Sequence, residues 1–231
     1  MFENLYSYES EIQRNIDFQI NNPIPNTPII YDKIFFNSQF KGYAMEYKKG
    51  TQTFRESINS DISFDDKINA ICDIYQALKY LHERKIYIGD IHSDNFLIGP
   101  NGRGYVIDLE NIRFPGDEFK FEQCYLIKPN NNQNRINIAN AYTDNVKTMI
   151  SSLTLLLGLD LEKMISKKSH DINLEELNQK IILPLKDNNL TVYIEKLMYS
   201  HQNKKVDYFD DFLRMPQKSK KQSNYKIKWN L

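Results

Sequence analysis

A hairpin signal near the middle of the chain constrains the fold more than any other feature. The apolar runs Phe96–Ile98 and 105–107 flank a turn that contains the dipeptide Asn-Gly, which is the strongest short-range signal for a β-hairpin. Such a hairpin would bring Asp108, at the exit of its second strand, close to Asn95, at the entry of its first. Asp90 precedes Asn95 by five residues, so all three side chains would converge at the open end of the hairpin. These three side chains offer the oxygen ligands that Mg²⁺ prefers.

Composition places the chain among ordinary globular proteins. Its 231 residues are 41% hydrophobic and 26% charged, with a formal net charge of zero, so nothing in the charge balance favours nucleic acid or a membrane surface as a partner. The cysteines Cys72 and Cys124 are far apart, and Cys72 falls in a helical pattern, which favours a buried thiol over a disulfide. We see no secretory signal and no run long enough to span a bilayer. We therefore expect a cytoplasmic protein with no nucleic-acid or membrane partner.

The patterning of the first 47 residues predicts a small lobe. Apolar side chains at spacings of three and four over 4–20 indicate a helix with Ser7 as its N-cap. Two strand-like runs follow, 29–36 and 42–47. A helix and a hairpin are too small to form a core alone. We place a boundary at residue 48, where the pattern breaks.

The remainder of the chain predicts a mainly helical lobe over 48–216 and a basic, flexible tail over 217–231. Ser63 and Asp66 resemble a capping box at the start of a long helix over 64–84. A second, strongly apolar helix over 146–157 would be buried, with Thr143 or Asp144 as its cap. The predicted fold class is therefore α+β.

The segment LHERKIYIGDIHSDNFLI resembles the catalytic loop of eukaryotic-type protein kinases, in which Asn follows the Asp of H-R-D after four residues. Asp90 and Asn95 occupy these two positions, and Asp108 stands where the family has the Asp of D-F-G. The resemblance covers about residues 5–215. It implies a protein-kinase-like fold with a mainly α-helical C-lobe and a reduced N-lobe of one helix plus a β-hairpin.

The resemblance also implies roles. Asp90 would be the catalytic base, Asn95 and Asp108 would hold Mg²⁺ against the phosphates of ATP, and the acceptor would be a Ser or Thr hydroxyl of a protein substrate. His92 stands where family members often have Lys and would approach the γ-phosphate.

Outside that loop, the same resemblance places the nucleotide-binding hinge at 45–47, so that Glu46 and Tyr47 would contact ATP. It also makes Asp144 the buried aspartate that anchors the catalytic loop from a central helix.

Several departures from the family pattern raise a second hypothesis. The sequence has no Gly-rich phosphate loop and no V-A-I-K lysine ahead of its first helix, and the helix glutamate would be Glu9 or Glu11, each of which we expect on a solvated face. Ile88 and Gly89 replace the His and Arg before the base, and Glu110 replaces the Gly of D-F-G. The alternative is therefore a catalytically inactive pseudokinase or truncated kinase that binds a partner, and a partner chain would complete the N-lobe.

Two other interpretations of the loop are weaker. Asp90 and Asn95 would, in the simplest case, cap local backbone groups of a polar loop. The run 89–92 also resembles the G-D-x-H opening of metallophosphoesterases, whose two-metal site needs further ligands. His170 and His201 are the remaining candidates and neither lies in a G-N-H context.

Overall fold

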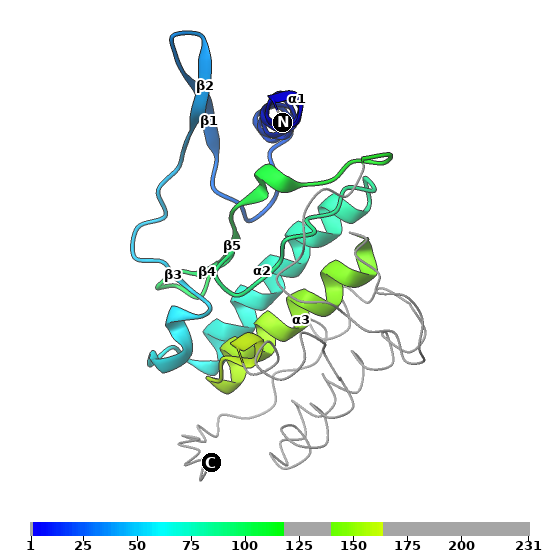
Figure 1. The fold of residues 1–231 in the computed structure, drawn as a ribbon. Helices are drawn as coiled ribbons and strands as arrows, with labels where there is room; N and C mark the ends of the chain where they lie inside the picture. Colours follow the sequence, from blue (N-terminus) through cyan, green and yellow to red (C-terminus); the bar gives the residue numbers. More distant parts are fainter. Residues whose placement is uncertain (1, 118–139, 164–231) are drawn as a thin grey trace, which may run out of the picture.

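A computed structural model describes residues 2–117 and 140–163 of the chain, and side chains within this part except those of 2–8 and 142. The described part is mixed α+β, with helices and two small antiparallel sheets, as the sequence predicted (Figure 1). The elements are, in order, α1 (Phe2–Asn21), β1 (Ile30–Phe36), β2 (Gln39–Met45), β3 (Gln52–Thr53), the 3₁₀ turn η1 (Glu56–Asn59), α2 (Phe64–His82), β4 (Phe96–Ile98), β5 (Gly104–Val106), the 3₁₀ turn η2 (Leu109–Asn111) and α3 (Ala141–Leu157).

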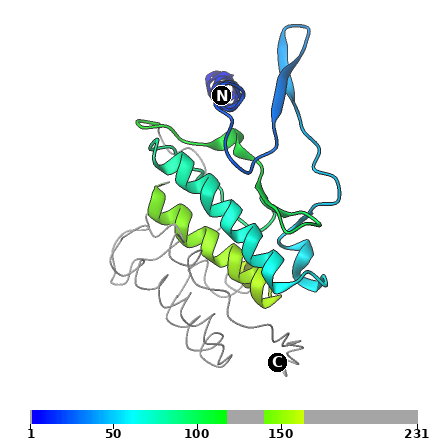
Figure 2. The ribbon, with the colours of Figure 1, turned by 180° about the vertical axis from the view of Figure 1, so that it is seen from behind.

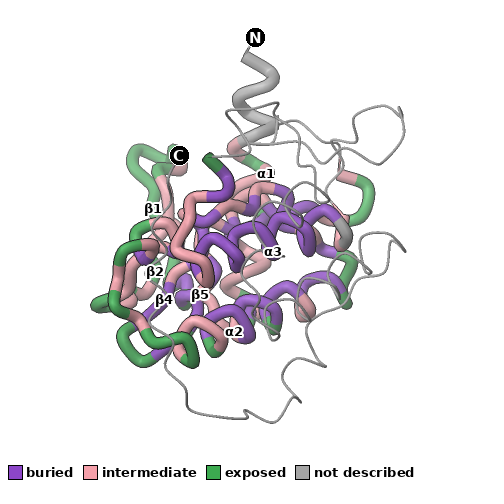
Figure 3. The backbone as a smooth tube through the Cα atoms, turned by 90° about the horizontal axis from the view of Figure 1, so that it is seen from below, coloured by how far each residue is buried: buried purple, intermediate pink, exposed green. Residues whose placement is uncertain are grey.

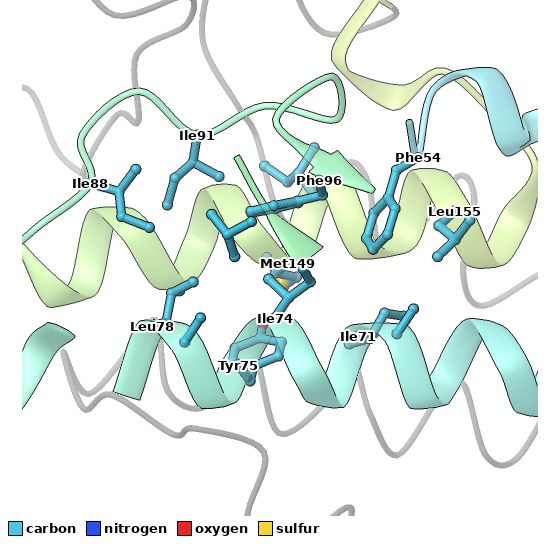
Figure 4. Close-up of a cluster of buried hydrophobic side chains, with 14 of the residues drawn as sticks. Phe54, Ile71, Ile74, Tyr75, Leu78, Ile88, Ile91, Phe96, Met149 and Leu155 are labelled. Atoms are coloured by element: carbon cyan, nitrogen blue, oxygen red, sulfur yellow. The ribbon is translucent and has the colours of Figure 1, made fainter. Parts of the chain in front are cut away.

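The core lies between α2 and α3 and beneath the strands β4 and β5. The two helices run side by side in both views of the ribbon (Figures 1 and 2). Side chains from both helices and from the loop that follows α2 meet in one apolar cluster (Figure 4). Fully buried members of that cluster include Phe54, Tyr75, Leu78, Ile91 and Phe96.

Helix α2 begins where the sequence predicts. The Ser63 hydroxyl accepts a hydrogen bond from the Asp66 backbone N–H and donates one to the Asp66 carboxylate. These bonds satisfy an N–H group that the first helical turn leaves open. The helix ends at His82, two residues before the predicted end.

The predicted hairpin forms as β4 and β5, with Phe96 opposite Val106 and Ile98 opposite Gly104. The strand β3, which the sequence analysis missed, pairs with β4 and completes a three-stranded sheet in the order β3-β4-β5. Gly104 lies so close to the Ala70 backbone that a Cβ atom would overlap it. This contact brings the hairpin directly onto α2.

The strands β1 and β2 form a separate two-stranded sheet. A two-residue turn at Asn37 and Ser38 joins them, and both residues have positive φ, 49° and 61°, as the twist of a tight hairpin requires. The second strand therefore begins at Gln39, three residues before the predicted start. Figure 3 shows this hairpin largely exposed, in contrast to the buried backbone of α2 and α3.

Two predicted helix caps are wrong. Helix α1 begins at Phe2, so Ser7 lies inside it and is not its N-cap. Helix α3 begins at Ala141 with Asn140 as its cap, and Thr143 supplies the reciprocal bond of a capping box. These two capping side chains therefore lie six and three residues ahead of the predicted apolar run, which begins at residue 146.

Some predictions fall outside the described residues, namely the tail 217–231, Cys124 and most of the C-lobe beyond residue 163. The lobe boundary at residue 48 stays a prediction. Cys72 is a buried free thiol. Among the helices that are described, none is long and apolar enough to cross a membrane.

Candidate active site

The loop between α2 and β4 carries the predicted catalytic residues and is fixed at both ends by apolar side chains. Ile88 and Ile91 are buried, and Phe96 is fully buried at the start of β4. Between them Gly89 has φ +76°, a left-handed conformation that glycine adopts without steric cost. The loop therefore turns immediately before Asp90, whose side chain stays partly exposed.

Asp144 on α3 anchors this loop, as the kinase resemblance predicts. Its carboxylate is fully buried and accepts hydrogen bonds from the backbone N–H groups of Ile88, at 2.7 Å, and Gly89, at 3.0 Å. His82 Nε2 lies 3.1 Å from the same carboxylate. A charged acceptor that binds two backbone donors is among the stronger hydrogen-bonding arrangements in a protein interior. The anchor acts on the loop backbone directly ahead of Asp90.

Lys147 binds the next peptide group of the loop, between Gly89 and Asp90, and the sequence did not lead us to predict this contact. Its ammonium donates a 2.7 Å hydrogen bond to the Gly89 carbonyl, and the residue is only 1% exposed. Lys147 follows Asp144 by three residues, so the two side chains leave the same face of α3. A lysine within an apolar helical run could have indicated this contact. A buried charge without a partner is costly, so a lysine in a buried helix implies a specific partner.

A second polar network braces the loop near Asp94. Glu162, 4% exposed, accepts hydrogen bonds from the Ser93 backbone N–H and the Ser151 hydroxyl. Arg55 forms ion pairs with the carboxylates of Glu162 and Asp94, at 2.7 and 2.9 Å. The loop backbone is therefore bound at residues 88 and 89 by Asp144 and Lys147 and at Ser93 by Glu162.

The structure brings Asp90, Asn95 and Asp108 into one neighbourhood. Asn95 Nδ2 donates a 3.0 Å hydrogen bond to the Asp90 carbonyl. The Ile107 backbone N–H donates to the Asn95 carbonyl at 3.0 Å, which continues the hairpin ladder up to Asp108. Because Nδ2 bonds Asp90, the Oδ1 atom of Asn95 is the one available as a metal ligand.

The donor chemistry of Asn95 and Asp108 fits Mg²⁺, which proteins often bind through one or two side chains together with substrate phosphates. The described residues contain no group of three or more His, Cys, Asp or Glu side chains that would form an all-protein metal cage.

Glu110 and Tyr43 are two further polar groups beside Asp108 that the sequence analysis did not assign. The Tyr43 hydroxyl donates a 3.1 Å hydrogen bond to Glu110 Oε2. Burial and the hydrogen bond and negative charge of Asp108 raise the pKa of Glu110 to about 7. Burial, with the charge of Glu110, raises the pKa of Tyr43. Glu110 therefore keeps its proton to a higher pH than an ordinary carboxyl group does.

The remaining predicted site residues are His92, whose carbonyl accepts a 2.9 Å hydrogen bond from the Asn95 N–H, and Glu46 and Tyr47, which follow β2. His92 is half-buried, with Nδ1 3.6 Å from Asp94 Oδ2. Glu46 pairs with Lys48 at 2.7 Å and exchanges backbone and side-chain hydrogen bonds with Ile29, and Tyr47 is 83% exposed. The roles of His92, Glu46 and Tyr47 stay predictions.

The two candidate helix glutamates differ in their surroundings. Glu11 forms an ion pair with Arg113, and their side chains are only 12% and 7% exposed. Glu9 accepts a 3.4 Å hydrogen bond from Gln13 within the helix. The prediction that both lie on a solvated face is therefore wrong for Glu11, because a partner more than a hundred residues away in sequence covers it.

Comparison with known proteins supports a kinase-like relationship. No protein-family model matches the chain. Aurora kinase A-A and Aurora kinase A-B of Xenopus laevis are each 30% identical to it over 104 residues, which is 44% of this chain and 25% of each relative. The chain thus spans a quarter of the length of these curated relatives. This distant similarity, together with the mixed α+β architecture, is compatible with a kinase-like fold.

Proposed function

We propose that this chain is a protein-kinase-like phosphotransferase that transfers the γ-phosphate of ATP to a Ser or Thr hydroxyl with Mg²⁺. The observation that carries the proposal is the contact of the Asp144 carboxylate with the backbone N–H groups of Ile88 and Gly89. This contact fixes the loop that bears the proposed base, and the β4–β5 hairpin brings the proposed metal ligand next to it. The distant similarity to Aurora kinases supports the reaction class.

In the proposed reaction, Asp90 orients the acceptor hydroxyl and accepts its proton while the hydroxyl oxygen bonds to the γ-phosphorus. The bond from that phosphorus to the β-phosphate oxygen breaks, and ADP leaves. Asn95 Oδ1 and the Asp108 carboxylate would hold Mg²⁺, which supplies positive charge to the phosphate oxygens. His92 would contact the γ-phosphate through the ring nitrogen that does not face Asp94.

The nucleotide and the substrate extend the proposed site beyond this loop. Glu46 and Tyr47 follow β2 and would contact ATP from the hinge. The proposed cofactors are ATP and Mg²⁺, and the proposed partner is a protein substrate.

One observation favours a second function, that of a non-catalytic module that binds a partner chain. The β1–β2 hairpin exposes several large apolar side chains, among them Tyr31 at 62% and Phe36 at 67% exposure. Apolar groups gathered on one exposed element often mark an interface. A partner seated there would complete the small lobe without any need for phosphate transfer.

Mg-ATP binding and phosphate transfer separate the two functions. We expect Mg-ATP to raise the melting temperature of the wild-type chain, and the chain to transfer ³²P from the γ-position to a Ser/Thr peptide library. Asp90→Asn should keep the thermal shift and reduce transfer by about 10² or more, whereas Asp108→Asn should reduce both.

Asp61→Asn is the matched control, because Asp61 is an exposed carboxylate outside the site and the change removes the same charge. Wild-type protein that shows neither a Mg-ATP shift nor transfer would refute the enzymatic proposal. Transfer that survives in Asp90→Asn at the control level would refute the role of Asp90.

A further inference from the structure

One face of α1 contacts the segment that follows Asp108. Figures 1 and 2 show α1 beside the part of the chain that carries η2. The contacting side chains recur at spacings of three and four, so they share one face of the helix. They are Glu11, Arg14, Asn15, Phe18 and Gln19.

Asn15 is the centre of this contact and is 0% exposed. Its Nδ2 donates to the carbonyl oxygens of Glu110, at 2.7 Å, and Ile112, at 2.9 Å. Gln19 Nε2 donates to the Leu109 carbonyl at 3.0 Å. Two amide side chains on α1 therefore satisfy three backbone carbonyls directly after Asp108, and side-chain amides are suited to this because each offers two N–H donors.

Contacts on either side align the helix with the same segment. Arg14 binds the two carboxylate oxygens of Asp117 at 2.9 and 2.7 Å, a fork geometry that fixes orientation. The ring of Phe18 meets that of Phe114 edge to face, with centroids 5.1 Å apart. The polar clamp of Asn15 and Gln19 is thus part of an extended and specific docking of α1.

The backbone at Asp108 explains why such a clamp matters. Asp108 has φ +62° and ψ +45°, a left-handed conformation that a residue with a Cβ atom adopts at a cost. The hairpin fixes the chain ahead of Asp108, since the Ile107 N–H donates to the Asn95 carbonyl. Asn15 and Gln19 fix the chain behind it. The direction of the Asp108 carboxylate therefore depends on both attachments.

We propose that Asn15, assisted by Gln19, is a positioning residue for Asp108: by holding the carbonyls of residues 109, 110 and 112, it keeps Asp108 in the orientation that binds Mg²⁺. The metal-binding consequence rests on the proposed function, whereas the clamp itself does not. Helix α1 would thereby influence metal binding through hydrogen bonds to the backbone that follows the metal ligand.

Hydrogen exchange of the nucleotide-free chain tests the clamp, and Mg²⁺ titration tests its consequence. Asn15→Leu removes both donors at similar side-chain volume, and Gln19→Leu removes one donor at a less buried position. Asn21→Leu is the matched control, because Asn21 is exposed on the same helix and bonds only within it. We expect Asn15→Leu to raise exchange in peptides covering 108–117 by about tenfold or more, with α2 unchanged.

In the presence of ATP, Mg²⁺ should raise the melting temperature. For Asn15→Leu, the Mg²⁺ concentration that produces half of this thermal shift should be about tenfold higher or more than for the wild type. Gln19→Leu should change both measurements in the same direction by less, and it decides the question if Asn15→Leu does not fold. Unchanged exchange over 108–117 in Gln19→Leu and Asn15→Leu overturns the clamp. Raised exchange with an unchanged Mg²⁺ requirement overturns the positioning role. A wild-type chain without any Mg-ATP shift refutes the proposed function, and exchange still decides the clamp.

Discussion

Replacement of Asp144 by Asn weakens the contact on which the proposed site depends. The Asp144 carboxylate uses one oxygen for the Ile88 N–H and the other for the Gly89 N–H. An amide of the same shape has one carbonyl oxygen, so it can accept from only one of these groups. Its NH₂ group then faces the other backbone donor, and a buried N–H remains unsatisfied. The substitution therefore changes hydrogen bonding at nearly constant volume.

The expected cost follows from these bonds. Loss of one hydrogen bond to a charged acceptor removes about 1.5–3 kcal/mol, and an unsatisfied buried donor costs about 1–3 kcal/mol more. Lys147, buried one turn along α3, also loses a nearby opposite charge. We expect Asp144→Asn to lower the free energy of unfolding by roughly 3–5 kcal/mol, a large share of the 5–15 kcal/mol that is typical of a domain.

Urea unfolding followed by circular dichroism measures this cost. Ser152→Ala is the matched control, because Ser152 is also fully buried on α3 but bonds only the Thr148 carbonyl of its own helix. We expect that variant to lose about 1 kcal/mol or less. The reasoning is refuted if Asp144→Asn unfolds at the urea concentration of the control.

Three further predictions concern the elements around the site. The pKa of Glu110 is raised from 4.5 to about 7, so its contribution to stability is complete below pH 4.5 and is lost as pH rises through 7. The pKa shift corresponds to a loss of about 3 kcal/mol in the free energy of unfolding, and solvent screening of a half-buried group reduces this to about half. Glu110→Gln should remove this pH-dependent loss. Urea unfolding midpoints of both proteins, measured against pH, test this. Ser63→Ala should cost about 1 kcal/mol in the same assay, because α2 loses its N-cap. Gly104→Ala should cost roughly 3 kcal/mol and lower the melting temperature, because its Cβ would overlap the Ala70 carbonyl, and a melting temperature like that of wild type would contradict this contact.

The parts of the fold that the sequence predicted well depend on local signals. The Ser63 cap and the apolar period located α2, and the Asn-Gly turn located the β4–β5 hairpin, whose second strand begins one residue before the predicted run 105–107. Each signal lies within a few residues of the structure that it specifies. The prediction failed at the start of α3, because apolar periodicity marks the buried part of a helix and the Asn140 capping box lies ahead of it.

The residues missed at the site depend on contacts between distant segments. Glu11 and Arg113 are 102 residues apart in the sequence, and nothing in the sequence near Glu11 indicates that its charge is buried. Tyr43 and Glu110 meet only because β2 lies beside the segment after Asp108. Amphipathic patterns distinguish buried from exposed faces, but they do not identify which partner covers a charged residue.

The loop is held through its backbone, so residues 88 and 89 can differ from the kinase pattern without loss of these contacts. Asp144 and Lys147 bind backbone N–H and C=O groups of residues 88 and 89, so the anchor does not use the side chains at these positions. Ile88 can therefore replace a histidine and contribute a buried apolar contact instead, and Gly89 can replace an arginine and supply a left-handed turn. The same logic applies to Asn15, which binds the carbonyls of Glu110 and Ile112 rather than their side chains. A site fixed through its backbone tolerates changes of motif residues, provided that the helices α1 and α3 keep the polar groups that reach it.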